Sequence, residues 1–240
     1  MAKASSELIY LFGGDSPWQS RDWTSSDDRV RGGASKSHLT CLPFSSVAVF
    51  HGHLDTKTLG GAGFASQRTT SENRLWDISH YDGLELDIKE TDGKRYTFIL
   101  KDRLLPKSPN GREQSTVSWE YDFQYPEADE AKKVFIAWKD LKPTYRGREK
   151  QDAEPLDLKR VRRVSLMMRS FFGSQEGDFS LSITSIAATK ISAGSSSWSP
   201  YRHDPDALEE KDVTWNKGER RQSFMAQGRA WFAWLCDIVY

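Results

Sequence analysis

Apolar and polar side chains alternate with a period of two along much of this chain. Residues 84–88 (LELDI) put three aliphatic side chains on one face and two carboxylates on the other, and residues 117–123 (VSWEYDF) and 179–184 (FSLSIT) repeat the pattern. Successive side chains of a β-strand point to opposite faces, so this spacing predicts strands that are buried on one side. Shorter apolar runs predict further strands at residues 47–50, 63–66, 96–101, 134–138 and 164–168.

These roughly eight strands are separated by clusters of Gly, Pro, Asp and Ser, and long helical periodicity is absent up to about residue 190. Such a chain predicts an all-β fold in which two sheets form a jelly-roll sandwich. Between the strands at 84–88 and 96–101, residues 91–94 (TDGK) supply an Asp-Gly pair that tolerates positive φ. This pair predicts a tight hairpin joining the two strands.

The chain changes character after residue 191. Residues 192–199 (SAGSSSWS) have the composition of a flexible linker, which predicts one domain over residues 8–191 and an extension over 192–240. The Asp-Pro-Asp at 204–206 is typical of a helix start. Several apolar side chains further on share one helical face: Phe224, Trp231, Trp234, Leu235 and Ile238. We therefore expect a short, partly helical extension that docks on the sandwich, with a partner or lipid contact as the alternative.

The charge is balanced, with 34 Lys and Arg against 34 Asp and Glu. A balanced chain has no global field that would draw it to nucleic acid or to a membrane surface, so neither is an expected partner. The basic run at residues 159–163 (KRVRR) lies close to Asp152, Glu154 and Asp157. We expect a solvated loop held by salt bridges there rather than a phosphate-binding surface.

Cysteine usage and the chain start indicate where the protein works. Cys41 and Cys236 are the only cysteines, too few for a disulfide framework and not spaced as a thiolate metal site, which favours a reducing compartment. No apolar run approaches the roughly 20 residues of a membrane span. The first twelve residues (MAKASSELIYLF) have neither the apolar core of a signal peptide nor the arginines of a transit peptide.

Catalytic and cofactor-binding signatures are scarce. The sequence has no GxSxG, P-loop, HExxH or GxGxxG motif, so we expect neither an enzyme nor a bound cofactor. His51 and His53 would share one strand face but lack a third ligand nearby, and we expect surface histidines rather than a metal site. Paired carboxylates such as Asp27 and Asp28 lie in loop-like segments, where the alternative is a structural Ca²⁺.

The most unusual segment is residues 25–35 (SSDDRVRGGAS). Gly32 and Gly33 permit backbone angles that other residues avoid, and Arg29 and Arg31 alternate along an extended run. One interpretation is a strand that enters a tight turn and is pinned by Arg–Asp pairs. The other is an exposed recognition loop.

At this segment the chain resembles the complex I intermediate-associated protein 30 family, over about residues 8–191. The more specific blocks are residues 27–33 (DDRVRGG) and 60–68 (GGAGFASQR). The resemblance extends to the following short motifs: residues 12–14, Trp18, Trp23, Ser35, Ser37, and residues 50–54, 76–79, 81–84 and 155–158.

This resemblance implies a galactose-binding-like jelly roll that has no catalytic role. It implies a mitochondrial protein of the matrix side that helps assemble respiratory complex I by binding unfolded or partly assembled protein, with a cytoplasmic paralogue that serves another client as the alternative. Arg and Trp are over-represented at interfaces. Our candidate partner-binding residues are Asp28, Arg29, Arg31, Gly32, Gly33, Trp138 and Arg169.

Two other classes of function stay open at this stage, although we do not expect a small-molecule or glycan ligand. A carbohydrate-binding module needs exposed aromatic faces beside polar groups, and Trp119, Tyr121 and Phe123 have a suitable spacing, although core packing explains them as well. A glycoside hydrolase would need two carboxyl groups about 5–9 Å apart across a cleft. Sequence spacing in a sandwich does not show such a pair.

Overall fold

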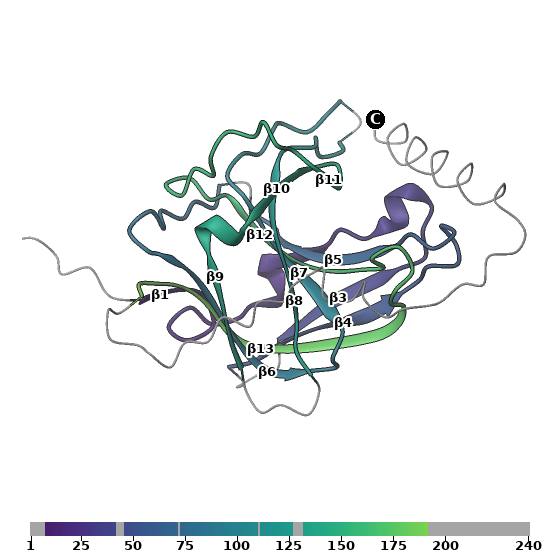
Figure 1. The fold of residues 1–240 in the computed structure, drawn as a ribbon, viewed down its shortest axis with the longest axis horizontal. Helices are drawn as coiled ribbons and strands as arrows, with labels where there is room; N and C mark the ends of the chain where they lie inside the picture. The colour runs from purple at the N-terminus through teal and green to yellow at the C-terminus, as the bar shows by residue number, and fades with distance from the viewer. Residues whose placement is uncertain (1–7, 42–45, 72, 110, 127–131, 192–240) are drawn as a thin grey trace, which may run out of the picture. The chain divides into compact units, whose positions relative to one another are not determined.

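Two antiparallel sheets stack on each other around a core of aromatic and aliphatic side chains (Figure 1). The structure is a computed structural model, and it describes residues 8–41, 46–71, 73–109, 111–126 and 132–191. No α-helix occurs in these residues, and no helix among them is long and apolar enough to cross a membrane. The prediction of an all-β sandwich is therefore confirmed.

The first sheet has six strands and lies at the bottom of Figure 1. Its order is β3 (Lys36–Cys41), β4 (Ala48–Leu54), β13 (Gly177–Thr189), β6 (Gly83–Thr91) and β9 (Lys132–Ala137). The sixth strand, β1 (Leu8–Phe12), pairs with the second half of β13 on the edge whose first half pairs with β4. The long central strand β13 thus pairs with three other strands of this sheet, β1, β4 and β6.

The second sheet has seven strands. Its order is β11 (Arg148–Glu149), β10 (Lys142–Tyr145), β8 (Ser118–Gln124), β7 (Arg95–Lys101), β12 (Arg163–Arg169), β5 (Phe64–Thr69) and β2 (Trp23–Ser25). Three short 3₁₀ helices complete the described elements: η1 (Ser20–Asp22), η2 (Asp28–Arg31) and η3 (Trp138–Asp140).

The alternation in the sequence is the alternation of core and outer faces. In β8, Trp119 and Phe123 are buried and Tyr121 packs against the core, whereas Glu120 and Asp122 lie on the outer face. Aromatic rings fill the middle of the sandwich, where the Phe50 and Phe179 ring centroids lie 5.0 Å apart. Because Trp119, Tyr121 and Phe123 face the core, the aromatic sugar platform considered from the sequence is wrong.

The predicted hairpin at the Asp92-Gly93 turn is also wrong. The two strands flanking it exist, but β6 belongs to the six-stranded sheet and β7 to the seven-stranded sheet, so the chain crosses between the layers there. Gly93 does take a positive φ, 76°. A left-handed glycine serves a hairpin and an inter-sheet corner equally well, so the local sequence did not decide between them.

Two further expectations change. Arg163 of the basic run is buried at the start of β12, with its guanidinium 2.7 Å from a Glu113 carboxylate oxygen, so this residue does not belong to a solvated loop. The linker and helix expected after residue 191 lie outside the described residues, and the domain division at that point stays a prediction.

Candidate functional site

The segment 27–33 forms a tight turn instead of the expected extended run. Residues Asp28–Arg31 make the 3₁₀ helix η2, and Gly32 follows in the left-handed conformation with φ of 82°. The backbone N–H groups of Gly32 and Gly33 donate to Arg29 O and Asp28 O. The turn leaves Arg29 and Val30 exposed, with Val30 at 72% exposure.

Two buried carboxylates hold this turn through hydrogen bonds from serine side chains and backbone N–H groups. Asp28 is fully buried and accepts hydrogen bonds from Ser35 N (3.1 Å), Ser35 Oγ (2.7 Å) and Phe64 N (3.0 Å). Asp27 repeats the arrangement with Ser37 and the N–H of Ser66. These carboxyl oxygens face hydrogen-bond donors, which is not the setting of a Ca²⁺ ligand.

A close approach explains the second glycine of the pair. A Cβ at Gly33 would lie 2.3 Å from the Asp28 carboxyl carbon, a distance at which one of the two groups must move. The family-specific blocks at 27–33 and 60–68 therefore meet in space, because Asp28 of the first binds the backbone of Phe64 in the second. We call this set of bonds the aspartate clasp: Asp27, Asp28, Ser35, Ser37, Phe64 and Ser66.

The clasp holds the backbone of Phe64, and Phe64 begins a row of side chains that crosses the outer face of the second sheet. Phe64 of β5 pairs in register with Arg169 of β12, and Arg31 from the turn stacks over the Phe64 ring at 5.4 Å. Arg169 donates from one terminal nitrogen to both oxygens of Asp122 (2.6 and 2.9 Å) and from the other to Glu120 at 2.8 Å. Because its two terminal nitrogens bind two different carboxylates, the guanidinium plane is fixed as well as its charge.

The loop that follows β12 is strained. Phe171, Phe172 and Gly173 have φ values of 44°, 61° and 84°, a left-handed run that only glycine adopts without cost. Phe171 lies against two guanidinium groups, with the Arg95 carbon at 3.9 Å and the Arg169 carbon at 4.8 Å from the ring centroid. Strained backbone of this kind persists only where its surroundings fix it, and it is frequent at functional sites.

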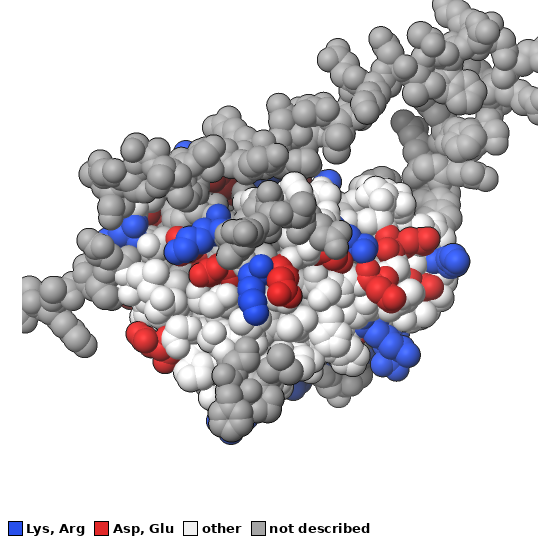
Figure 2. Space-filling model, turned by 90° about the horizontal axis from the view of Figure 1, so that it is seen from below, with Lys and Arg blue, Asp and Glu red and all other residues white. Residues whose placement is uncertain are grey.

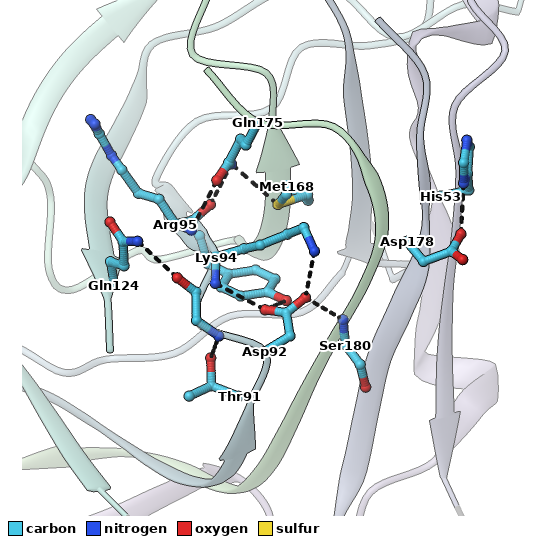
Figure 3. Close-up of polar contacts among 12 residues, drawn as sticks. His53, Thr91, Asp92, Lys94, Arg95, Gln124, Met168, Gln175, Asp178 and Ser180 are labelled. Atoms are coloured by element: carbon cyan, nitrogen blue, oxygen red, sulfur yellow. Dashed lines mark hydrogen bonds and ion pairs between the residues drawn. The ribbon is translucent and has the colours of Figure 1, made fainter. Parts of the chain in front are cut away.

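Gln175 provides part of that fixing (Figure 3). Its Oε1 accepts from Arg95 N at 3.0 Å, and its Nε2 donates to Arg95 O (2.8 Å) and Arg169 O (2.6 Å). The amide side chain thus imitates a strand backbone at the start of β7 and the end of β12. At the other side of the loop, Ser170 N donates to Gly63 O at 3.0 Å.

The fixed loop presents one large apolar side chain to solvent. Phe172 is 86% exposed, although exposing an aromatic ring is unfavourable. We call the whole surface the Arg–Phe end of the sandwich: Arg31, Phe64, Arg95, Arg169, Phe171 and Phe172. Guanidinium groups and aromatic rings are the side chains enriched at protein interfaces.

The candidate residues chosen from the sequence divide between several places. Arg31 and Arg169 lie in the Arg–Phe end, while Asp28 and Gly33 lie beneath it in the clasp. Arg29 lines a groove on the other side of the turn. Trp138 lies in η3 after β9 of the other sheet, where its Nε1 donates to Tyr81 O at 2.6 Å.

Sequence reasoning missed Phe64, Arg95, Phe171, Phe172 and Gln175. Their positions follow from strand register and from one loop conformation, neither of which leaves a periodic pattern. The sequence offered one signal of this site, the Phe-Phe-Gly run that follows a predicted strand. Two adjacent aromatic side chains in a turn are not needed to fill a strand's core face, so they indicate another role.

A second polar cluster fixes the inter-sheet corner at Asp92 (Figure 3). The Asp92 carboxylate accepts hydrogen bonds from Tyr96 Oη (2.8 Å), Lys94 N (3.1 Å) and Ser180 N (3.0 Å). Burial and then the Asp92 charge raise the pKa of the Tyr96 phenol well above its ordinary value. This cluster connects β6, β7 and β13 and is fully committed to the fold.

The outer face of the second sheet also carries a partly buried network of charges, in which Arg163 is buried and Glu113 is exposed. Glu113 bridges Arg68 and Arg163 at 2.9 and 2.7 Å, and Lys101 Nζ donates to the carbonyl oxygen of Thr116 at 3.3 Å. Burial, followed by the charge of Arg163, lowers the pKa of Lys101 to about 8. On the face shown in Figure 2, the described acidic and basic side chains are interspersed and form no large patch of a single charge.

The histidines of β3 and β4 lie on the outer face of the first sheet. His51 and His53 do point to the same side of β4, where His51 shares a 2.9 Å hydrogen bond with Thr40 and His53 one of 2.6 Å with Asp178. Within the described ranges, no group of three or more His, Cys, Asp or Glu side chains is placed to hold a metal ion.

Comparison with known proteins agrees with the resemblance of the sequence blocks. The sequence model of the family described as complex I intermediate-associated protein 30 matches residues 10–183. The chain is also 46% identical over 184 residues to the uncharacterized protein C9E9.15 of Schizosaccharomyces pombe, which covers 75% of this chain and 84% of that protein.

Solved structures with a similar fold are carbohydrate-binding modules. The family 11 module of the cellulosomal cellulase Lic26A-Cel5E of Clostridium thermocellum has a TM-score of 0.52 at 15% identity, covering 80% of this chain and 99% of the module. The same family's module in complex with a β-1,3-1,4-mixed-linked tetrasaccharide has a TM-score of 0.51 at 15% identity, covering 78% and 98%. Likenesses at this identity establish the β-sandwich fold alone.

Proposed function

This chain belongs to the complex I intermediate-associated protein 30 family, and from that premise we propose that it is a non-enzymatic assembly factor for respiratory complex I, NADH:ubiquinone oxidoreductase. In this role it binds an unfolded or partly assembled subunit through one face of the sandwich and releases it when the next partner docks. The protein then works in mitochondria, on the matrix side, and needs no cofactor.

The observation that carries the proposal is the family match over residues 10–183. It covers both blocks that build the aspartate clasp, so the features that resemble the family are the ones that position the turn at 28–33. Buried polar bonds of this kind specify one geometry for a surface loop. That geometry supports a surface formed before its partner arrives.

The contact surface in this proposal is the Arg–Phe end. Its loop is held by Gln175 and by the stacking of Phe171 on Arg95 and Arg169, so little conformational entropy is lost when a partner binds. In this contact, the exposed Phe172 ring packs against apolar side chains of the partner. The charged groups beside the ring contact polar side chains around them. Arg29 and Trp138 lie elsewhere, and we place them outside this contact surface.

The test is deletion of the gene in a host that has complex I. We expect a loss of mature complex I on native gels, accumulation of a subcomplex, and a selective fall in NADH-linked respiration. Succinate-linked respiration, which bypasses complex I, is the internal control and should not change. Normal complex I and normal NADH-linked respiration in the deletion strain would exclude this function.

The client is identified in the same strain by a tagged full-length chain. Pull-down from fractionated mitochondria and cytosol, followed by mass spectrometry, should recover complex I subunits from the mitochondrial fraction. Replacement of Phe172 by Ser should reduce that recovery, and replacement of the exposed Lys89 on β6 by Ser should leave it unchanged. Recovery of a cytosolic client by the wild-type chain would favour a paralogue that serves another assembly.

A further inference from the structure

An open groove with a volume of about 560 Å³ lies beside the 28–33 turn, on the side away from the Arg–Phe end. It is formed by β2, η2, β3 and β4, with Gln67 of β5 at its base. A volume of this size falls within the range of small-molecule sites. The residues that line it are Trp23, Thr24, Ser25, Asp27, Arg29, Lys36, Ser37, His38, Leu39, Thr40, His51 and Gln67.

Two exposed cations line the groove without an ion-pair partner. Arg29 comes from η2 and Lys36 from the start of β3, and neither side chain makes a hydrogen bond or an ion pair with another residue in the described parts of the chain. Arginine side chains present several donors in a planar fork, and lysine ammonium groups present three. Both groups are donors only.

Two imidazoles extend the same wall. His38 of β3 lies directly opposite His51 of β4 in the register, and their ring centroids are 5.4 Å apart. Burial and then the charge of His38 lower the pKa of His51, as expected for two such rings beside each other without an anion. The two rings add imidazole nitrogens to the groove wall that Arg29 and Lys36 also line.

A buried indole also borders the groove. Trp23 is 6% exposed and lines the groove, and its Nε1 is buried without a hydrogen-bond acceptor among the described residues. Buried indole N–H groups normally find an acceptor. The Trp23 ring is therefore a lining group whose indole signal can report on occupancy of the groove.

The one carboxylate in the groove does not neutralise these groups. Asp27 is 7% exposed, and its oxygens accept hydrogen bonds from Ser37 Oγ (2.6 Å), Ser37 N (3.2 Å) and Ser66 N (2.9 Å). The open positions in the groove are thus donors and cations, while its acid is committed to the clasp. This arrangement suits a ligand that is rich in acceptors and carries negative charge.

We propose that the groove beside the 28–33 turn binds the phosphate group of a small ligand through Arg29, Lys36, His38 and His51. A phosphate has enough oxygens to accept from several of these donors at once, whereas a carboxylate has two. The groove has room for a larger group attached to the phosphate. The site is separate from the proposed client surface, so either can fail without the other.

The test is a titration of the purified full-length chain with inorganic pyrophosphate. We expect the ¹H–¹⁵N signal of the Trp23 indole, assigned from its loss in Trp23→Phe, to shift together with the imidazole signals of His38 and His51. Arg29→Gln and Lys36→Gln should each weaken binding roughly tenfold. Lys89→Gln, an exposed lysine on β6 outside the groove, should bind pyrophosphate like the wild type.

Further arms of the same experiment separate the sources of the phosphate. Binding of soluble glycerol phosphate supports a free metabolite, and binding only to vesicles of phosphatidylcholine with phosphatidic acid supports a lipid headgroup. The proposal is overturned if pyrophosphate leaves the Trp23 signal unchanged, or if Lys89→Gln weakens binding as much as Lys36→Gln. It is also overturned if Zn²⁺ alone shifts the two histidines while pyrophosphate does not, since the pair would then be a metal site.

Discussion

At the scale of single residues, the aspartate clasp shows how a charged pair can serve structure in a segment that looks like a binding loop. Asp27 and Asp28 are adjacent in sequence, yet each takes its own serine and its own β5 N–H. The hydrogen-bond donors around each buried carboxylate replace the water that it loses on folding. The exposed Arg29 of the turn can therefore contact a ligand while the acids hold the backbone.

Replacing Asp28 by Asn tests this division. The amide keeps the volume of the carboxylate but removes its charge and places its NH2 group opposite either Ser35 N or Phe64 N, so we expect the free energy of unfolding in urea to fall by about 3 kcal/mol. Asp178→Asn is the matched control, because that carboxylate is 91% exposed and contacts only the exposed His53. Equal stability of the two variants would contradict the structural role of the clasp.

Lys101 gives a prediction about pH. Burial lowers its pKa in the folded protein to about 8, below the value of 10.5 in the unfolded chain. Between these pH values the unfolded state binds more protons, so this residue makes stability rise as pH increases, at most by about 1.4 kcal/mol per pH unit. Other groups also titrate there, and the difference from Lys101→Met isolates the effect.

The measurement for Lys101 is urea unfolding of both proteins at intervals from pH 7 to pH 9.5. We expect the unfolding free energy of the wild type minus that of Lys101→Met to increase across this range. The loss of the bonds to Thr116 in the variant shifts the difference by a nearly constant amount and does not alter its slope. A flat difference would show that the lysine keeps its ordinary pKa.

At the scale of elements, the loop between β12 and β13 combines a strained backbone with an exposed ring. If this loop is kept for binding, removing its strain should improve stability while harming function. Phe172→Gly removes the steric penalty of the left-handed conformation, which is about 1–2 kcal/mol. Against this, glycine loses more conformational entropy on folding, which costs about 0.5–1 kcal/mol. We expect the free energy of unfolding to rise by up to about 1 kcal/mol and client capture to fall.

Two companion variants make the Phe172 result interpretable. Phe172→Ala removes the ring but keeps the strain, so Phe172→Gly should be more stable than Phe172→Ala by the strain that glycine relieves, while client capture falls in both. Phe171→Ala removes the ring that stacks on Arg95 and Arg169 and should destabilise the protein. A Phe172→Gly protein that is less stable than the wild type would show that the ring stabilises the loop.

Local pattern and long-range pairing account for what the sequence could and could not predict. Alternation fixed the strands at 84–88, 117–123 and 179–184, because burial of one face requires period two wherever the strand pairs. Sheet membership of β6 and β7 depends on partners far along the chain, and the Asp92-Gly93 turn fits either outcome. Strand β3 (KSHLTC) was missed because only Leu39 marks its apolar face strongly.

The candidate site was harder to predict than the strands. The family-specific blocks located the turn at 28–33, and Arg31 and Arg169 were chosen from it and from the end of a strand. Their meeting at Phe64 and Phe171 depends on the β5–β12 register and on a loop with three positive φ angles. No short-range signal encodes either property.

At the scale of the whole molecule, both proposed sites and both complete sheets are built from residues 8–191. The core is closed by side chains within that range, from Leu11 to Ala188. We therefore expect a chain that ends at residue 191 to unfold cooperatively in urea, with a free energy of unfolding within about 1 kcal/mol of the full-length value.

The same shortened chain distinguishes the sandwich from the extension as the seat of function. If the phosphate groove and the Arg–Phe end act as proposed, the chain ending at residue 191 should bind pyrophosphate with the full-length affinity and still capture its client. Lys36→Gln within the shortened chain should weaken pyrophosphate binding, and Phe172→Ser should weaken client capture, each without affecting the other activity. A folded shortened chain that binds pyrophosphate but captures no client would place client recognition in residues 192–240 and remove the Arg–Phe end from that role.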